Sequence, residues 1–180
     1  MEEQEEVKWY AMRDLRRQNA KIKAYQELKE NGFEVFTPMH WVVTTIGGKK
    51  QRRQVPVISD MLFVRSGRSD LDKVVAVTDT LQYRYIKGMQ ATPITVRDQE
   101  MNDFVRACNA VAEVRYYLPE EITGDMIGKS VRIIGGTLDG LEGRLLKMRG
   151  SRKKRLLVQL PGLLSAAIEV TPTLIHPINE

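Results

Sequence analysis

The sequence predicts an α+β protein in which a helix-covered antiparallel sheet is followed by a small all-β domain. Residues 1–116 alternate strand-like segments with amphipathic helical segments, which is typical of a sheet covered by helices. Residues 125–180 hold five short strand-like segments between glycine-rich turns, which is typical of a small barrel. Residues 117–124 show neither period and contain Pro119 and Gly124, so we expect a linker there.

The first domain is expected to open with a strand at 8–12 and a helix over 15–31 that stops at Gly32. One face of this helix carries the apolar residues Leu15, Ile22, Tyr25 and Leu28. The opposite face carries the cations Arg16, Arg17, Lys21, Lys23 and Lys29. This division of the two faces indicates an amphipathic helix with a basic outer surface.

A hairpin is expected in the middle of the first domain. Strands at 33–37 and 41–45 are interrupted at Pro38, and the chain turns back within 46–50. Gly47 and Gly48 stand at the tip, as a tight hairpin turn requires. The chain then returns through 51–57 and enters an apolar strand at 61–64.

Two more helices complete the predicted first domain. Ser69 is expected to cap a short helix with Asp72 as its reciprocal partner, and a strand follows at 83–87. Thr95 is expected to cap a second long helix, with Asp98 three residues on. The apolar stripe of that helix is formed by Met101, Phe104, Val105 and Cys108.

In the second domain, the strand-like segments lie at 129–134, 143–149, 155–160, 166–170 and 174–176. The first of them runs into Gly135 and Gly136, and Gly143 opens the next. Glycine is favoured where a small barrel bends sharply or where two backbones approach closely.

Composition indicates an ordinary globular protein. The 180 residues are 28% charged and 42% hydrophobic, and no apolar run has the length of a membrane span. The single cysteine rules out an internal disulfide, and the acidic start 1–6 does not resemble a secretory signal, so we expect a cytoplasmic protein. Residues 125–180 carry nine Lys/Arg against five Asp/Glu, which accounts for +4 of the net charge of +5.

Catalysis has little support in the sequence. His40 and His176 are far apart and neither has metal-ligand spacing, while Cys108 lies on an apolar helix stripe and is expected to be an inert thiol. No phosphate-binding loop or nucleophile elbow is present. We therefore expect no enzyme, no metal and no cofactor, with an unrecognised active site as the minor alternative.

Basic segments point to binding instead. Lys49, Lys50, Arg52 and Arg53 cluster at the predicted hairpin, where they can track phosphates without reading bases. A second basic run occupies 147–155, with a turn expected at Gly150. For both segments the alternative is a solvated turn, since lysines also protect hairpins from edge pairing.

Two groups of motifs resemble known families. Residues 127–136, followed by Leu138-Asp139-Gly140-Leu141-Glu142-Gly143-Arg144-Leu145-Leu146, resemble a KOW motif, the signature of small SH3-like barrels. Lys8-Trp9-Tyr10, the basic helix and the segment 56–64 resemble the N-terminal α/β sandwich of NusG. The segment 156–170 is most similar to the UpxY group, NusG-like antiterminators of capsular polysaccharide operons, and it lacks the Phe-Gly-Arg turn of general NusG proteins.

The resemblance implies a polymerase-binding first domain and a KOW second domain. In NusG relatives a hydrophobic depression receives the clamp helices of RNA polymerase. The positions that correspond to it here are Ile58, Met61, Leu81 and Tyr83. Ordinary core packing is the alternative for Ile58 and Met61. The segment 58–61 also departs from the aromatic and proline-rich sequence that is usual in the family.

Nucleic-acid contacts are implied as well. The family's hairpin lies near upstream DNA and the non-template strand, which assigns such contacts to Lys49, Lys50, Arg52 and Arg53, and Arg16 and Arg17 invite the same assignment. Nascent RNA is a further expected partner, and the KOW domain is expected to contact the ribosome. No membrane partner is expected.

The function that the resemblance implies is specialised antitermination. Such a factor bridges the polymerase cleft and suppresses pausing or termination at selected operons, with capsular polysaccharide synthesis as an example. The alternative is a KOW-containing protein that binds RNA or the ribosome without polymerase. Either function requires binding alone, because the polymerase or the ribosome supplies the chemistry.

Overall fold

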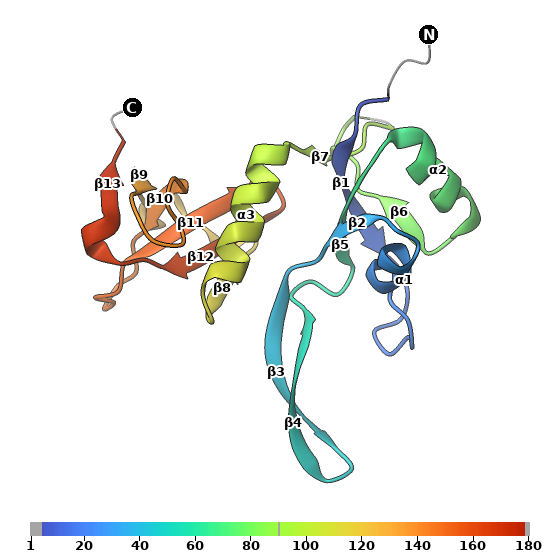
Figure 1. Ribbon diagram of the computed structural model, residues 1–180, viewed down its shortest axis with the longest axis horizontal. Helices are drawn as coiled ribbons and strands as arrows, with labels where there is room; N and C mark the ends of the chain where they lie inside the picture. The colour runs from blue at the N-terminus through green and yellow to red at the C-terminus, as the bar shows by residue number, and fades with distance from the viewer. Residues whose placement is uncertain (1–4, 90, 179–180) are drawn as a thin grey trace. The chain divides into compact units, whose positions relative to one another are not determined.

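A computed structural model describes residues 5–89 and 91–178. The chain folds as two compact units that divide between Asp98 and Gln99 (Figure 1). Part of the acidic start, residues 1–4, lies outside the described residues. The predicted domain boundaries, 1–116 and 125–180 with a linker at 117–124, stay a prediction.

The first unit is built on an antiparallel sheet with the strand order β2-β5-β1-β6. Its members are β1 (Lys8–Asp14), β2 (Glu34–Phe36), β5 (Met61–Ser66) and β6 (Leu81–Tyr83), and β7 (Thr95–Val96) also pairs with β1. The longest register joins β1 to β5, with Ala11 opposite Phe63. Both of these strands are largely buried through their apolar runs, Trp9 to Met12 in β1 and Met61 to Val64 in β5.

Two helices cover one face of this sheet, α1 (Ala24–Glu30) and α2 (Arg68–Val77). The core on this face consists of Tyr10, Met12, Ala24, Leu28, Val35, Leu62, Val64, Leu71, Leu81 and Tyr83. The rings of Tyr10 and Tyr83 meet edge to face, with centroids 5.6 Å apart. Edge-to-face packing of this kind adds specific geometry to the burial of apolar area.

The first helix is shorter than the sequence predicts, because residues 15–23 are not helical. Leu15 and Ile22, which were expected on the buried face, are 46% and 52% exposed. The backbone N–H of Leu15 donates to the carbonyl of Thr80, which lies just before β6, and the buried carboxylate of Asp14 accepts from the N–H groups of Arg16 and Ala24. Tertiary hydrogen bonds therefore override the helical pattern in this segment.

Two of the predicted helix caps are also wrong. Helix α2 begins at Arg68, one residue before Ser69, and both the N–H and the hydroxyl of Ser69 donate to the Glu5 carboxylate. Thr95 belongs to β7, and helix α3 (Asp98–Ala110) begins three residues later. In both places a partner distant in sequence takes over: a carboxylate 64 residues away for Ser69, and strand pairing with β1 for Thr95.

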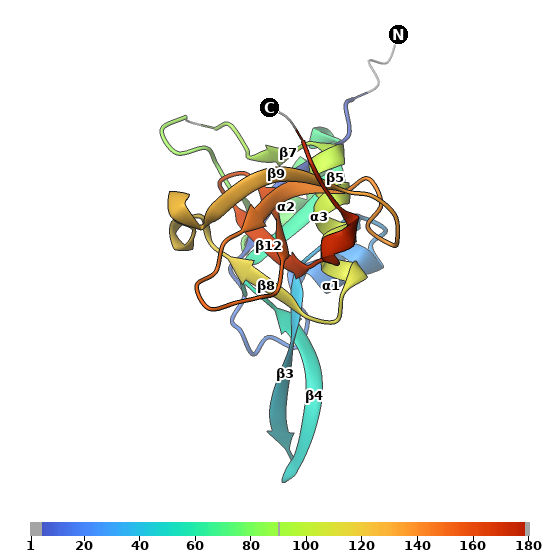
Figure 2. The same ribbon diagram turned by 90° about the vertical axis from the view of Figure 1, so that its left-hand side faces the viewer.

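The predicted hairpin is confirmed and is longer than expected. It consists of β3 (Met39–Ile46) and β4 (Lys49–Pro56), which pair over eight residues, and Figures 1 and 2 show it extending from the rest of the first unit. Gly47 and Gly48 both have positive φ, at 57° and 77°. These left-handed conformations are those of a two-residue hairpin turn, which glycine adopts without strain.

The second unit contains most of α3 and a six-stranded antiparallel sheet with the order β13-β9-β10-β11-β12-β8. Its strands are β8 (Val114–Tyr117), β9 (Ile127–Ile133), β10 (Glu142–Leu146), β11 (Arg155–Leu160), β12 (Leu164–Glu169) and β13 (Ile175–Pro177). Short 3-10 turns are η1 (Pro119–Glu121), η2 (Gly124–Met126) and η3 (Pro172–Leu174). The five predicted strand segments thus correspond to β9–β13, and the SH3-like KOW barrel itself stays a prediction.

A sixth strand, β8, was not expected. It pairs with β12 over four residues, with Tyr116 opposite Ala166. The four residues Val114–Tyr117 are too short a segment for a period-two pattern to be distinguished from a loop in the sequence.

Gly143 is required by a close approach of two strands. A Cβ atom at this position would lie 2.5 Å from the backbone oxygen of Leu157 in β11. This confirms that glycine is needed here for a close approach of two backbones, although β10 begins one residue earlier, at Glu142. Within the described residues, no helix has the length and apolar character to cross a membrane.

Candidate nucleic-acid interface

The four cations that the sequence placed at the hairpin all lie on β4 and are all exposed. They are Lys49, Lys50, Arg52 and Arg53. Residues 39–56 contain no aspartate or glutamate, so no carboxylate within the hairpin neutralises them. A ribbon of four unneutralised positive charges attracts phosphates over roughly a Debye length, about 8–10 Å at ordinary salt.

Strand pairing sorts these cations onto two faces. Directly opposite residues of an antiparallel pair share one face, so Arg52 lies with Val43, and Lys50 with Thr45. The other face carries Arg53 opposite Val42, and Lys49 opposite Ile46. The first face is exposed along its whole length from Trp41 to Thr45, whereas Val42 and Thr44 on the second face are half-buried.

Trp41 is a functional candidate that the sequence reasoning missed. Its side chain is 54% exposed, and the guanidinium carbon of Arg52 lies 5.0 Å from the centroid of its ring. The two residues are eleven positions apart, and only the strand register makes them diagonal neighbours. The available signal was the alternation of Trp41, Val43 and Thr45 on one face of the predicted hairpin.

A polar groove of about 610 Å³ borders the base of the hairpin. Its lining includes the cations Lys21, Lys23 and Arg53, together with the aromatic ring of Tyr25 and the amides of Gln18, Gln26 and Gln54. The described residues that line it include no carboxylate. Cations, amide groups and one aromatic ring are the side chains that nucleic-acid interfaces use for phosphates and bases.

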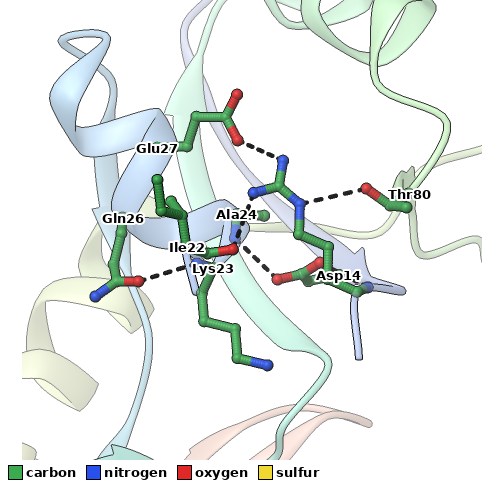
Figure 3. A network of polar contacts seen from close by, with 8 residues as sticks. Asp14, Ile22, Lys23, Ala24, Gln26, Glu27 and Thr80 are labelled. Atoms are coloured by element: carbon green, nitrogen blue, oxygen red, sulfur yellow. Dashed lines mark hydrogen bonds and ion pairs between the residues drawn. The ribbon is translucent and has the colours of Figure 1, made fainter. Parts of the chain in front are cut away.

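A hydrogen-bond network holds the irregular segment that forms one wall of this groove (Figure 3). The buried carboxylate of Asp14 accepts from the backbone N–H of Arg16 at 3.0 Å and from that of Ala24 at 2.9 Å. The Ala24 contact supplies a partner to a first-turn N–H of α1. Asp14 therefore fixes both ends of the segment 15–23.

Arg16 also belongs to this network. Its guanidinium forms an ion pair with Glu27, and it also donates to Thr80 Oγ1 at 3.4 Å and to the carbonyl of Ile22 at 3.2 Å. The backbone N–H of Lys23 donates to Gln26 Oε1 at 2.9 Å, and Lys23 Nζ donates to the carbonyl of Arg17 at 2.7 Å. The wall of the groove is thus held by several side chains at once.

The two predicted arginines of this segment differ in their surroundings. Arg16 is half-buried and its charge faces Glu27, so its guanidinium is engaged within the protein. Arg17 is exposed, and its recorded contacts are made by its backbone carbonyl, which accepts from Lys23 Nζ and from the N–H of Ala20. Their assignment to nucleic-acid binding stays a prediction, and the geometry favours Arg17 over Arg16 for that role.

The residues predicted to contact polymerase lie mostly in the core. Met61, Leu81 and Tyr83 are buried, whereas Ile58 is half-buried. For Met61 this placement agrees with the alternative of ordinary core packing. Leu81 and Tyr83 pack among the helices α1 and α2, because the short strand β6 turns both side chains to the same covered face.

Tyr83 is further held by polar contacts. Its hydroxyl donates to Asp72 Oδ1 at 2.7 Å, and the Arg68 guanidinium lies 4.3 Å from its ring centroid. Burial and the hydrogen bond to Asp72 raise the pKa of Tyr83 well above its ordinary value. Burial acts against ionisation of Asp72, but the hydrogen bonds from Tyr83 and Arg68 still hold the pKa of that carboxyl below its usual 3.8.

In the second unit, the basic run lines a groove of about 510 Å³. Its walls carry Lys129, Lys147, Arg149, Lys153 and Lys154, with Asp125 as the carboxylate among the lining residues. Lys153 forms an ion pair with Glu169 at 2.7 Å, and the buried Arg155 donates to Met148 Sδ. Part of the run is therefore neutralised or buried.

The groups considered for chemistry are divided between the two units, with His40 in the first and Cys108 and His176 in the second. Among the described residues, no cluster of three or more His, Cys, Asp and Glu side chains could hold a metal ion. Burial raises the pKa of Cys108 to about 11, and the hydrogen bond with Tyr116 opposes this only in part. At neutral pH the thiol is therefore protonated, and the protonated form is a poor nucleophile.

Comparison with known proteins identifies the family. The family model described as "NusG: Transcription termination factor nusG" matches residues 7–105, which is more than half of the chain. The chain therefore belongs to the NusG family. The matched residues take in the sheet, the hairpin and most of α3, whereas the sheet of the second unit lies beyond them.

Comparisons with curated proteins and with solved structures do not extend this assignment. No curated protein matches the chain. A solved structure described as "Domain interaction in Thermotoga maritima NusG" is similar at 16% sequence identity, with a TM-score of 0.49, covering 97% of this chain and 98% of that chain.

Proposed function

We propose that this chain is a NusG-type transcription elongation factor that binds RNA polymerase and holds nearby nucleic acid with its β3–β4 hairpin. The observation that carries the proposal is the family match over 7–105, which includes a hairpin with four exposed cations and no carboxylate. The factor contributes binding free energy, and the polymerase carries out all catalysis.

Its mechanism would be a shift of population. A factor that binds the closed, elongating polymerase better than the paused one moves the equilibrium towards elongation. A tenfold shift needs only about 1.4 kcal/mol of differential binding, so a modest interface is sufficient.

For the polymerase contact we propose the surface around Ile58. Ile58 is the half-buried member of the four residues assigned to this contact, and its carbonyl accepts from the N–H of Met61 at 3.2 Å. Met61, Leu81 and Tyr83 would support that surface from the core. The bound partner would be a helical segment of polymerase such as the clamp helices.

We further propose that the factor is specialised rather than general. The resemblance of 156–170 to the UpxY group, and the absence of a Phe-Gly-Arg turn there, support antitermination at selected operons, such as those for capsular polysaccharides. In this proposal the second unit is a KOW domain whose partner differs from that of general NusG proteins.

Binding of RNA or the ribosome through the second unit is the second candidate function. The basic groove of about 510 Å³ favours it, since five of its lining residues are Lys or Arg. In this case the affinity would depend steeply on salt and would not require polymerase.

In vitro transcription with the cognate polymerase tests the proposal. We expect saturating protein to shorten pauses or to increase read-through on a template from a controlled operon. The test variant is Ile58→Asp, which introduces a charge at the proposed polymerase contact. It should remain folded and should no longer shorten pauses or increase read-through. Unchanged pausing and read-through, together with co-sedimentation with ribosomes, would favour the second candidate.

A further inference from the structure

We infer that the exposed face of the β3–β4 hairpin is a binding platform for unpaired nucleic acid, on which a base stacks against Trp41 while Lys50 and Arg52 hold the backbone. This inference rests on the proposed nucleic-acid contact of the hairpin and adds to it the class of strand that is bound. The face is defined by Trp41, Val43 and Thr45 on β3 and by Lys50, Arg52 and Gln54 on β4.

The apolar side chains on this face are exposed although they gain nothing for folding. Trp41 is 54% exposed and Val43 is 65% exposed, on a hairpin whose two strands pair only with each other. A two-stranded hairpin gains little stability by itself, and exposed apolar side chains on it contribute almost nothing to folding. The other tryptophan, Trp9, is 4% exposed and belongs to the core. The exposure of Trp41 therefore indicates a role in binding and not in the core.

The exposed apolar area on this face is small. It consists of one indole ring and one valine side chain, bordered by two cations and the amide of Gln54. Protein interfaces bury several apolar anchors, whereas a single stacked base needs one aromatic face. The area thus fits a base better than a protein surface.

The charge of the hairpin favours an anionic ligand. The hairpin carries four cations and no carboxylate, so the ligand that complements it is an anion. The Arg52 guanidinium carbon lies over the Trp41 ring, 5.0 Å from its centroid, which orients the indole, so the base would stack on the ring face that the guanidinium does not cover. Gln54, directly opposite Trp41, adds an amide that can hydrogen-bond to a base edge.

The requirement for an unpaired strand follows from stacking. In a duplex the faces of the bases are covered by their neighbours, so an indole cannot stack on them without local opening. In a single strand every base offers a free face, which makes the contact tolerant of sequence. Stacking also makes no use of the sugar, so unpaired DNA and unpaired RNA should bind alike, apart from contacts to the 2′-hydroxyl.

The experiment uses the full chain without polymerase, so it is independent of the transcription assay. Binding of oligo(dT), oligo(U) and a duplex of equal length is measured by fluorescence anisotropy for the unaltered protein, Trp41→Leu, Trp41→Phe and Lys50→Ala. Trp41→Leu should weaken both single strands by about tenfold and leave the duplex unchanged, with the same salt slope. Trp41→Phe, which retains an aromatic ring, should retain most of the affinity.

Lys50→Ala is the matched control for phosphate binding. It should weaken single strands and duplex alike, and lower the slope of log affinity against log salt by roughly 0.7–0.9. Stacking should also quench the tryptophan emission of the unaltered protein when oligo(dT) is added, and leave Trp41→Leu unquenched. In that variant the emission of Trp9 reports whether the core remains folded.

Two results would overturn the inference. Unchanged single-strand affinity in a folded Trp41→Leu variant would exclude stacking. An equal loss of single-strand and duplex affinity in that variant would show that Trp41 does not select unpaired strands.

Discussion

Arg16 and Glu27 form an ion pair that joins the segment after β1 to the first helix. The two residues are eleven positions apart, and the same guanidinium reaches Thr80 and the carbonyl of Ile22. The pair therefore lies where three parts of the first unit meet. It determines the path of residues 15–23, and with it one wall of the polar groove.

Replacement of Arg16 should lower stability, whereas replacement of Arg17 should not. Arg16→Ala removes the hydrogen bonds to Thr80 and Ile22 and leaves Glu27 without its partner, so the free energy of unfolding should fall by about 1–2 kcal/mol. Hydrogen exchange at 15–23 should accelerate. Arg17→Ala should leave stability within about 0.5 kcal/mol and affect only nucleic-acid binding. Equal stability losses in urea unfolding would contradict this division.

Tyr83→Phe should destabilise the first unit in a pH-dependent manner. The hydroxyl donates to Asp72, whose ionised form it stabilises, so its removal should cost about 1 kcal/mol at pH 7. Because the pKa of Asp72 is depressed in the folded protein, this contribution is present above the ordinary value of 3.8 and is lost as the pH falls below it. Urea unfolding at pH 7 and pH 3 measures the difference. A difference between the two proteins that is as large at pH 3 as at pH 7 would argue against the Asp72 contact.

Cys108 should react slowly while the chain is folded. Burial raises the pKa of its thiol to about 11 from 9.0, so the thiolate fraction near neutral pH falls by about 100-fold. Alkylation by iodoacetamide should be slower than in urea by about the same factor. The rate in the folded protein should rise with pH up to about 11. Folding stability should decline over the same range, because the unfolded chain loses this proton first. Equal rates with and without urea would show that the thiol is accessible.

Gly143→Ala should destabilise the second unit strongly. The new Cβ would lie 2.5 Å from the backbone oxygen of Leu157, so the strands β10 and β11 must separate, at a cost of roughly 1–3 kcal/mol or more. Gly124→Ala is the matched control, since a Cβ there has no atom within 4 Å. Thermal or urea unfolding of the full chain compares the two. A loss of stability in Gly124→Ala that matches that of Gly143→Ala would contradict the steric explanation.

Neutralising the hairpin tip should lower the salt dependence of nucleic-acid binding. Lys49→Ala with Lys50→Ala removes two charges, and each lost phosphate contact should reduce the slope of log affinity against log salt by roughly 0.7–0.9. The control removes two exposed charges elsewhere in the first unit, with Lys29→Ala and Lys87→Ala. Both variants change the net charge equally, so only a contact at the hairpin makes their slopes differ.

Regular elements with local signals were predictable from the sequence. The hairpin followed from Gly47 and Gly48 between two strand-like runs, and the apolar strand at 61–64 corresponds to β5. The helix at 15–31 was half wrong because Asp14 bonds the N–H groups of Arg16 and Ala24, an arrangement that helical periodicity does not reveal. Such tertiary hydrogen bonds depend on where the chain folds back, which composition and spacing leave undetermined.

The candidate site likewise contains residues that the sequence reveals and residues that only the structure reveals. The four hairpin cations could be found from the sequence, because charge clusters remain exposed whatever the fold. The neighbourhood of Trp41 and Arg52 could not, since it depends on the register of β3 against β4. The burial of Leu81 and Tyr83 also required the structure, because apolar residues on a short edge strand can either face a core or remain open.

The pairing of β8 with β12 determines where a chimera between this protein and its relatives can be joined. A fusion that joined a foreign first domain at residue 118 would discard the strand that covers β12. The newly bared edge would run through Leu164–Glu169, five of whose six residues are buried. An apolar edge with free N–H and C=O groups is a template for other chains, so such a fusion should aggregate. A junction placed before Val114 would carry the protecting strand along and avoid this.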